Sequence, residues 1–436
     1  MKNFTLASET ELYTILNDLE EQYRHFCTQN LKLNMARGKP SPSQLDLSAP
    51  LLEKMESYIL EDGTDARNYG ILEGIPECRR LFGETLGIDP DLILIGGNSS
   101  LNMMFDTLSF LCMFGTEGER PWLRHGFSGH SVKFLCPIPG YDRHFKICEK
   151  LGIEMIPVPL LDDGPDMEIV SGLAGTDPYI KGIWCVPLHS NPQGVCYSDR
   201  VVEQLASMET AACDFRIFWD NAYAIHPVYE EVSLKNIIKE CRRYKHPNRP
   251  YYFFSTSKIS FPGAGIALVA SSPKNIEELK AHMSVQTIGH DKLNQLRHVQ
   301  FFKTPENLKN HMKDLAEQLR PKFDAVLDKL ETNLGGTHLA TWSHPKGGYF
   351  ISLDTLPGCA KETITLAKKA GVILTDAGAT YPYGIDPSDT NIRIAPSYPA
   401  PHELELAMDI LTVCIQIAGI KKLLKDQGGK RDGKQI

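Results

Sequence analysis

Residues 251–258 read Tyr-Tyr-Phe-Phe-Ser-Thr-Ser-Lys, an apolar run that ends in three hydroxyl residues and a lysine. The run Tyr251–Phe254 has the length and aromatic content of a buried strand. A lysine at the rim of a sheet can be partly shielded from solvent. This desolvation lowers the pKa of its amine and makes the amine a nucleophile. Alone, such a segment is more often a solvated lysine in a serine-rich turn, so Lys258 needs support from the rest of the chain.

Three further candidate strands precede this segment, and each ends in polar residues or a turn. They are Leu92–Ile95, Gly182–Leu188 and Phe215–Trp219. Helical patterns alternate with them, which is typical of a mostly parallel α/β sheet. Because the carboxyl ends of parallel strands share one edge, we expect the residues after these strands to meet there.

Three polar segments are candidates for that edge. Asn191-Pro192-Gln193-Gly194 follows one strand and alone is simply a turn. In Asp220-Asn221-Ala222-Tyr223 the carboxylate follows Ile-Phe-Trp and needs a cationic or hydrogen-bonding partner, unless it is a helix N-cap. In Asn391-Ile392-Arg393-Ile394 the arginine points to the strand face opposite the isoleucines, either as an exposed cation or as a carboxylate clamp.

The order and spacing of these four segments resemble the fold-type-I aminotransferases. Two upstream segments extend the resemblance, one over residues 69–79 (Tyr-Gly-Ile-Leu-Glu-Gly-Ile-Pro-Glu-Cys-Arg) and one over residues 137–141 (Pro-Ile-Pro-Gly-Tyr). Residues 34–40, 96–102 and 257–265 are similar to a bacterial aspartate aminotransferase subgroup that is labelled MocR-like aminotransferase. The resemblance implies a fold-type-I α/β transferase that binds pyridoxal 5'-phosphate.

The resemblance also implies a role for each matched residue. Lys258 would hold the cofactor as a Schiff base and move a proton, and Asp220 would keep the pyridine nitrogen protonated. Asn191 and Tyr223 would bind the phenolic oxygen of the cofactor. Arg393 would clamp the α-carboxylate of the substrate, and the remaining substrate-binding positions would be Arg37, Gly38, Lys39 and Asn191.

The cofactor phosphate would lie at the N-terminus of a helix that begins near Ser99, where free backbone N–H groups and the helix dipole favour an anion. Side chains from this turn and from the lysine segment would add donors: Asn98, Ser99, Ser100, Ser255 and Ser257. Tyr69 would reach the phosphate from a neighbouring subunit, which implies a homodimer. Tyr141 is the candidate for stacking on the ring, with Pro139 as the competing position.

Two features depart from the family or stay open. Most relatives carry an arginine seven or eight residues after the lysine, where this chain has Gly265 and Ile266. The replacement cation could be Arg37, Lys39 or Lys292, or the dipole and hydroxyls could suffice. A dicarboxylate substrate needs a second cation, and the candidates are Arg37, Lys39, Lys292 and Arg297.

Length and composition set the outer limits. The chain of 436 residues can form a large domain over residues 56–320 and a smaller α+β domain from residues 1–55 and 321–425, with a flexible tail at 426–436. A net charge of −8 argues against binding to nucleic acid or an anionic membrane. Eleven scattered cysteines without a Cys-x-x-Cys pair favour a reduced, cytoplasmic setting, and no run of about 20 apolar residues predicts a membrane span.

The family resemblance predicts an aminotransferase that exchanges amino groups between an amino acid and a 2-oxo acid by a ping-pong mechanism. Aspartate and 2-oxoglutarate are the predicted pair. The alternatives are transfer from 2-aminoadipate, an aromatic amino acid or alanine, and a pyridoxal-phosphate carbon–sulfur lyase. Gly263-Ala264-Gly265 leads into a strand-like run and not a helix, which excludes a dinucleotide fingerprint. A transcription regulator would need a basic recognition helix before Tyr69, and none is evident.

Overall fold

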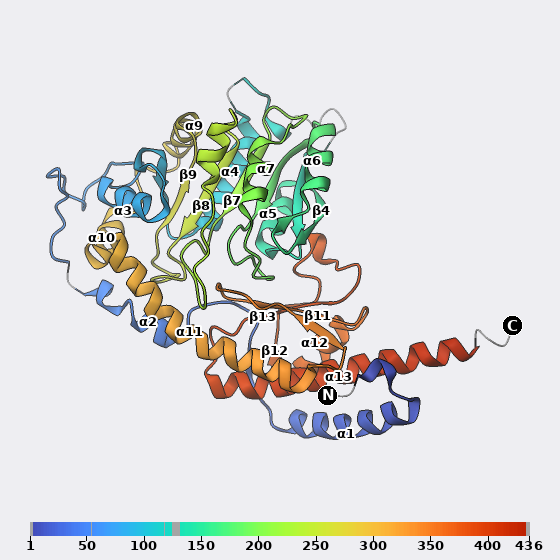
Figure 1. The fold of residues 1–436 in the computed structure, drawn as a ribbon. Coiled ribbons are helices and arrows are strands. Elements are labelled where there is room, and N and C mark those ends of the chain that lie inside the picture. Colours follow the sequence, from blue (N-terminus) through green and yellow to red (C-terminus); the bar gives the residue numbers. More distant parts are fainter. Residues whose placement is uncertain (1–2, 54, 117, 124–130, 433–436) are drawn as a thin grey trace.

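A computed structural model describes residues 3–53, 55–116, 118–123 and 131–432 of the protein. Its larger part is built on an eight-stranded sheet in the order β2-β9-β8-β7-β6-β3-β4-β5 (Figure 1). The pairs from β8 through β7, β6 and β3 to β4 are parallel, and β9 and β5 pair antiparallel to their neighbours. The strands are β2 (Ile93–Ile95), β3 (Lys133–Ile138), β4 (Glu154–Leu161), β5 (Gly164–Pro165), β6 (Ile180–Cys185), β7 (Arg216–Asp220), β8 (Pro250–Ser255) and β9 (Ala267–Ala270).

Helices cover both faces of this sheet, which confirms the predicted α/β class. One apolar cluster joins one face to α3 (Pro76–Leu86), α6 (Met167–Thr176), α7 (Asp199–Ser207), α8 (Ile237–Arg243) and α10 (Lys292–Phe302). A separate cluster joins the other face to α4 (Ser100–Phe114), α5 (Asp142–Leu151) and α9 (Pro273–Met283). Both faces of the central strands are therefore buried, as parallel sheets require.

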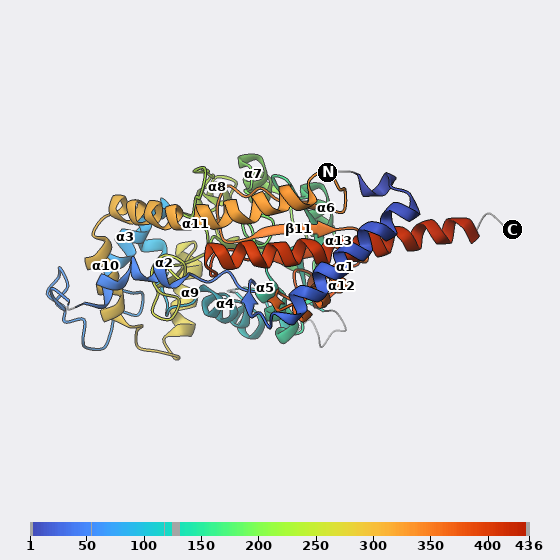
Figure 2. The same cartoon turned by 90° about the horizontal axis from the view of Figure 1, so that it is seen from below.

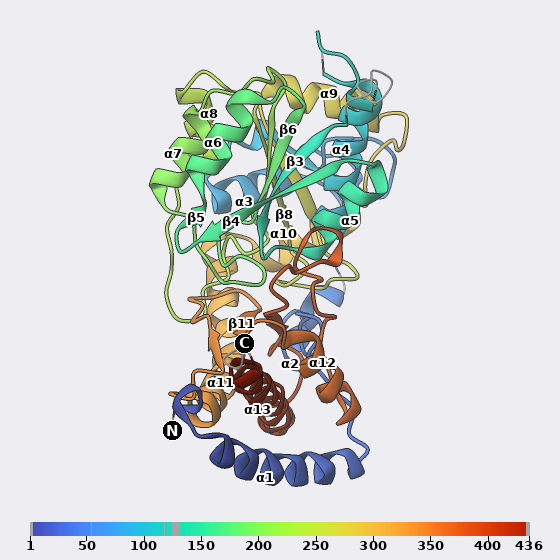
Figure 3. The same ribbon diagram turned by 90° about the vertical axis from the view of Figure 1, so that its right-hand side faces the viewer.

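A second, smaller layer lies beside the carboxyl edge of the large sheet (Figures 1 and 3). Its three-stranded sheet has the order β10-β11-β13, and a parallel pair joins β1 to β12. The strands are β1 (Leu33–Asn34), β10 (Ala340–Trp342), β11 (Ile351–Thr355), β12 (Val372–Ile373) and β13 (Asn391–Ile394). The helices are α1 (Glu9–Thr28), α2 (Pro42–Asp46), α12 (Ala360–Lys369) and α13 (Pro401–Asp432).

The long helix α11 (Pro305–Leu334) connects the two layers, because its first half packs with the large sheet's core and its second half with the small layer's core. Helix α1 crosses below α13 and closes the base of the small layer (Figure 2). The predicted boundary at residues 320/321 falls inside α11, and the domain limits stay a prediction. Helix α13 continues through residues 426–432 of the predicted tail, and residues 433–436 lie outside the described part.

The strand before Asn191 is shorter than predicted. We expected residues 182–188, but β6 ends at Cys185. Pro187 has no N–H to offer a neighbouring strand, and its carbonyl accepts from Tyr197 N, which folds residues 187–197 into a loop. Within the described residues, no helix is both long enough and apolar enough to cross a membrane.

Candidate active site

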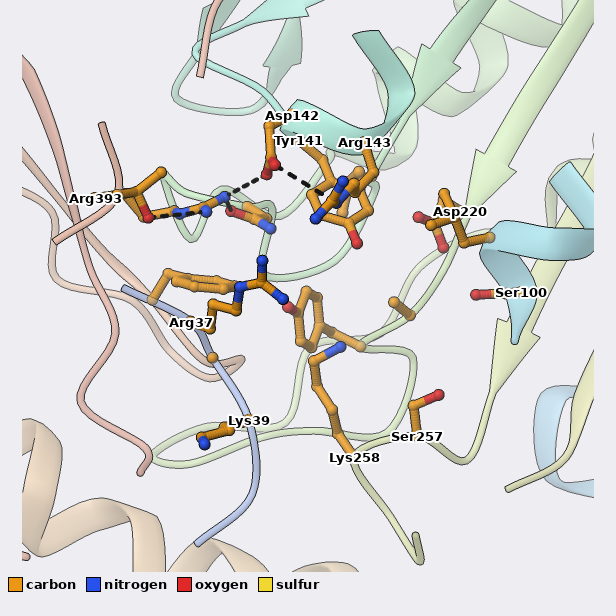
Figure 4. A pocket seen from close by; sticks show the side chains of 18 of the residues that line it. Arg37, Lys39, Ser100, Tyr141, Asp142, Arg143, Asp220, Ser257, Lys258 and Arg393 are labelled. Atoms are coloured by element: carbon orange, nitrogen blue, oxygen red, sulfur yellow. Dashed lines mark hydrogen bonds and ion pairs between the residues drawn. The ribbon is translucent and has the colours of Figure 1, made fainter. Parts of the chain in front are cut away.

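A cavity of about 500 Å³ lies between the carboxyl edge of the large sheet and the small layer (Figure 4). The residues that the four motifs predicted all line it, although they lie up to two hundred residues apart in sequence: Asn191, Asp220, Tyr223, Lys258 and Arg393. Other predicted residues line it as well: Arg37, Gly38, Lys39, Ser99, Ser100, Tyr141, Ser255 and Ser257. The shared sheet edge therefore brings the predicted segments together.

Lys258 projects into this cavity from the turn after β8 (Figure 4). Its Nζ lies 5.0 Å from the ring centroid of Tyr223 and 5.9 Å from that of Tyr349. Burial lowers the pKa of the Lys258 amine, and the charge of Asp220 partly opposes this shift. A buried amine with a lowered pKa is a nucleophile at moderate pH.

A buried histidine on α10, His298, holds the turn that carries Lys258. His298 Nε2 lies 2.8 Å from Ser260 Oγ, and its Nδ1 lies 2.8 Å from the carbonyl oxygen of Asn294. Burial lowers the pKa of His298 to about 4, so the ring is neutral near pH 7, donates from Nδ1 and accepts at Nε2. Thr256 Oγ1 also accepts from Ile266 N at 2.8 Å, which closes the turn.

Asp220 ends β7 on the side of the cavity opposite Arg393 (Figure 4). Its Oδ2 lies 2.9 Å from His144 Nε2, and the His144 ring stacks on Trp184 with centroids 4.2 Å apart and planes 7° apart. Its Oδ1 is buried and has no hydrogen-bond partner among the described residues. A buried carboxylate oxygen without a partner is costly, so Oδ1 is positioned to accept from a cationic N–H of a bound ligand.

Serine hydroxyls gather at the N-terminus of α4. Ser99 caps the helix by accepting from Asn102 N, and Ser100 is its first residue. Ser255 Oγ donates to Ser257 Oγ at 3.1 Å across the same corner of the cavity. Free N–H groups, the helix dipole and several hydroxyls make this corner suitable for a phosphate.

The absence of the expected arginine from this corner has a steric basis. A Cβ atom at Gly265 would lie 2.9 Å from both Phe261 O and Thr256 Oγ1, so the turn leaves no room for a side chain there. Ile266 is buried in the core of the large sheet. Neither position can carry a cation without a change in the turn that holds Lys258.

Arg393 leaves β13 towards the cavity, opposite to the buried Ile392 and Ile394, as the strand alternation predicted. Its NH1 group donates to Asp142 Oδ1 at 2.9 Å and to Asn191 Oδ1 at 3.2 Å. Its NH2 group donates to Thr375 Oγ1 at 3.1 Å. These contacts hold a planar cation in one orientation at the wall of the cavity.

The segment with Arg37, Gly38 and Lys39 crosses the mouth of the cavity. A Cβ atom at Gly38 would lie 2.6 Å from the ring of Phe350, so only glycine fits this close approach. The ammonium group of Lys39 lies 3.7 Å from the ring centroid of Tyr398. The segment therefore packs tightly on the small layer and presents cations to the cavity.

Several predicted residues lie elsewhere. Asn98 does not line the cavity, because its side-chain amide donates to Pro262 O at 3.0 Å. Tyr69 is 82% exposed and lines a separate surface pocket with Lys292, whose Nζ donates to Gly70 O. Arg297 and Lys292 do not line the main cavity, and Pro139 lines only a small neighbouring pocket behind Tyr141.

Three residues on the first turn of α5 were missed: Asp142, Arg143 and His144. Asp142 and Arg143 line the cavity, and His144 contacts Asp220. The signal was available, since they directly follow the matched residues Pro137–Tyr141 at the carboxyl edge of the sheet. A charged or imidazole side chain at that edge is a candidate site residue even when no motif includes it.

The arrangement fits the cofactor that the sequence resemblance implies. Lys258 provides an amine for an aldehyde, the free oxygen of Asp220 provides an acceptor for a ring N–H, and the α4 corner provides donors for a phosphate. Arg393 provides a fork for a substrate carboxylate. The remaining cations that line the cavity are Arg37, Lys39 and Arg143.

Comparisons with known proteins agree with this geometry. The family model described as aspartate amino-transferase matches residues 7–427. An aspartate aminotransferase of Corynebacterium glutamicum is 43% identical over 405 residues, which cover 92% of this chain and 93% of that protein. The crystal structure of an aspartate transaminase from Corynebacterium glutamicum has a TM-score of 0.93 and 41% identity, and the match covers 97% of this chain and 99% of that chain.

A more distant structure shares the fold alone. LysN, an α-aminoadipate aminotransferase from Thermus thermophilus crystallised with N-(5'-phosphopyridoxyl)-L-leucine, has a TM-score of 0.72 and 18% identity. The match covers 92% of this chain and 95% of that chain. Both layers of the present structure therefore have counterparts in aminotransferases of low sequence identity.

Proposed function

The chain belongs to the aspartate aminotransferase family and is a pyridoxal-phosphate-dependent aminotransferase, and we propose that it transfers the amino group of aspartate to 2-oxoglutarate. The observation that carries the choice of substrate is the set of cations around the cavity. Arg393 fits one carboxylate, and Arg143 and Arg37 lie where a second carboxylate of the same molecule would need a partner. A monocarboxylate would make no contact with them.

In this proposal Lys258 has two tasks. Its Nζ would hold the cofactor, and its free amine would take the proton from the substrate Cα. Burial favours the neutral form of this amine, which is the form that acts as a base. When bound, the cofactor's protonated ring withdraws electrons from the substrate and weakens the Cα–H bond.

Asp220 and Tyr223 prepare the site for that chemistry. The Oδ1 atom of Asp220 would hold the ring N–H, and His144 at 2.9 Å would keep the carboxylate oriented. Tyr223 is buried beside Lys258, and burial raises the pKa of its phenol, so it stays a hydrogen-bond donor. Together with Asn191 it would donate to the phenolic oxygen of the cofactor.

The phosphate would be held by this chain's α4 corner and by a second subunit. Ser99, Ser100, Ser255 and Ser257 would donate to it. Tyr69 would come from the partner, which requires a homodimer. In support, Tyr69 is 82% exposed, and Val285 and Ile288, in the α9–α10 connection that shares a surface pocket with the Tyr69 loop, are 88% and 62% exposed.

Two finer points belong to the proposal. We propose that the chain belongs to the subgroup labelled MocR-like aminotransferase, and the three segments at residues 34–40, 96–102 and 257–265 support this. The reaction follows a ping-pong course because one cavity must serve both the amino acid and the 2-oxo acid. A carbon–sulfur lyase would use the same cofactor contacts but has no use for a second carboxylate cation.

The test is a panel of amino donors with 2-oxoglutarate, followed by the colour change of the cofactor. Aspartate is expected to react at least roughly a hundredfold better than alanine, since charge-assisted hydrogen bonds to its second carboxylate contribute roughly 1.5–3 kcal/mol each. Half-reactions with aspartate alone should stop after one turnover and resume when 2-oxoglutarate is added. Equal rates for aspartate and alanine would contradict the dicarboxylate assignment, and release of pyruvate or ammonia from a sulfur amino acid would favour the lyase.

A further inference from the structure

The hydrogen bonds of Arg393 leave little of its guanidinium for a ligand. A guanidinium has five N–H groups. Asp142 and Asn191 occupy both N–H groups of NH1, and Thr375 occupies one of NH2. The Nε–H is buried and has no partner among the described residues. Of the four N–H groups on NH1 and NH2, described residues accept from three, and one, on NH2, remains for a carboxylate that enters the cavity.

One free N–H supports only a single hydrogen bond. The end-on form of bidentate arginine–carboxylate recognition uses two parallel bonds, one from NH1 and one from NH2. NH1 becomes available only if one of its present partners leaves. Asn191 is a neutral amide at 3.2 Å on the buried loop after β6, whereas Asp142 is a carboxylate at 2.9 Å, the same chemical group as the substrate's.

The position of Asp142 allows its carboxylate to give up the contact with Arg393. It is the first residue of α5, where the helix dipole favours a carboxylate regardless of its partner. Its side chain is 24% exposed, against 6% for Arg393. Its second oxygen, Oδ2, already lies 3.8 Å from Arg143 Nε, so the carboxylate keeps a cation when it loses Arg393 (Figure 4).

We propose that Asp142 competes with the substrate's α-carboxylate for Arg393. Asp142 binds Arg393 in the ligand-free protein and releases its NH1 group when the substrate binds. The proposal rests on the proposed function, because it needs a substrate whose carboxylate binds Arg393. A carboxylate that binds end-on to NH1 and NH2 must then displace Asp142, and its apparent affinity is lowered by that displacement. Asp142 is thus a residue that sets affinity.

A purely structural role for the same residue predicts the opposite sign. If Asp142 only positions Arg393 for the substrate, its removal loosens the arginine and weakens binding. If it competes, its removal frees NH1 and tightens binding. Asp142→Asn separates the two, because the amide keeps an oxygen acceptor of the same size but lacks the charge that makes the contact strong.

The experiment measures the binding of succinate, a dicarboxylate without an amino group, to the cofactor-loaded protein by the change in cofactor absorbance. We expect Asp142→Asn to lower the Kd for succinate by roughly five- to tenfold, the loss of one charge-assisted hydrogen bond. Asp142→Ser, which also suits a helix N-terminus, should shift the Kd in the same direction. Asp199→Asn is the matched control, since Asp199 is the first residue of α7 and lies away from the cavity.

The KM for aspartate and for 2-oxoglutarate should fall together with the Kd in both Asp142 variants. An unchanged or higher Kd in both variants would overturn the competitor role while leaving the proposed function intact, provided that the wild-type protein binds succinate. If neither wild type nor variant binds succinate or any other dicarboxylate, the proposed function fails, and the inference fails with it.

Discussion

His144 Nε2 lies 2.9 Å from Asp220 Oδ2, while the other oxygen of Asp220 has no hydrogen-bond partner in the part of the chain that the structure describes. The imidazole is itself fixed by stacking on Trp184. One oxygen is thus held by the protein and the other is left for a ligand. This division of the two oxygens leaves a carboxylate that is only 3% exposed with one acceptor for a cationic ring.

Asp220→Asn should therefore reduce the rate of amino transfer by roughly a hundredfold to a thousandfold, because a preorganised charge at the site of developing charge is lost. The measurement is kcat for aspartate with saturating 2-oxoglutarate. Asp220→Glu keeps the charge and should recover part of the rate. A variant Asp220→Asn with wild-type kcat would remove this residue from the account.

His144→Phe should lower kcat by about tenfold, since a hydrogen bond to a charged group is lost while the aromatic stack on Trp184 is retained. The readout that separates positioning from stability is the absorbance spectrum of the bound cofactor against pH, which should shift in His144→Phe. His144→Gln, which can still donate, should shift less. An unchanged spectrum in His144→Phe would show that the contact has no effect on Asp220.

Arg143→Gln should lower kcat/KM for dicarboxylate substrates alone. We expect kcat/KM for aspartate to fall by roughly a hundredfold, as for the loss of a charge-assisted contact, while kcat/KM for alanine changes little. The measurement is the ratio of the two values in wild type and variant. Arg37→Gln is the matched comparison, and whichever variant changes the ratio more identifies the principal partner of the second carboxylate. If neither changes it, the proposed substrate is wrong.

The stability of the protein should fall as the pH drops from 6.5 to 4, and His298 should contribute to the fall. Its pKa is about 4 in the folded protein against 6.5 ordinarily, so in this range the unfolded chain binds a proton that the folded chain does not. Protonation thus favours unfolding as the pH decreases. His298→Gln should flatten the pH dependence of the unfolding free energy by up to about 3 kcal/mol between these pH values.

Urea titrations of wild type and His298→Gln at pH 6.5 and pH 4.5 provide that comparison. His189 and His226 have pKa values lowered to about 4 and about 3 by burial and remain in both proteins. The difference between the two proteins therefore isolates His298. Parallel pH profiles would show that the histidine under the Lys258 turn is not held neutral.

The fold and the centre of the site could be predicted from the sequence because their signals are local. Lys258, Asp220 and Asn191 each follow an apolar strand, and parallel strands bring their ends to one edge. The position of Arg393 follows from strand alternation between two isoleucines. Their roles in catalysis stay predictions until the variants are measured.

The remaining features depend on contacts between distant segments, which no local pattern encodes. Asn98 was expected at the phosphate, but its amide is taken by Pro262 O, 164 residues away. Gly265 was recognised as a departure, yet only the packing against Phe261 and Thr256 shows that a side chain does not fit. Asp142 was not predicted as a site residue, because its role depends on its contact with Arg393, which lies 251 residues later in the sequence.

The central claim is that the cofactor is attached to Lys258, and chemical trapping tests it most directly. The protein is loaded with pyridoxal 5'-phosphate, reduced with borohydride, digested and mapped by mass spectrometry. The account predicts one modified peptide, with the added pyridoxyl phosphate on Lys258, and none in Lys258→Ala. Modification of a different lysine, or no modification of the wild type, would contradict it.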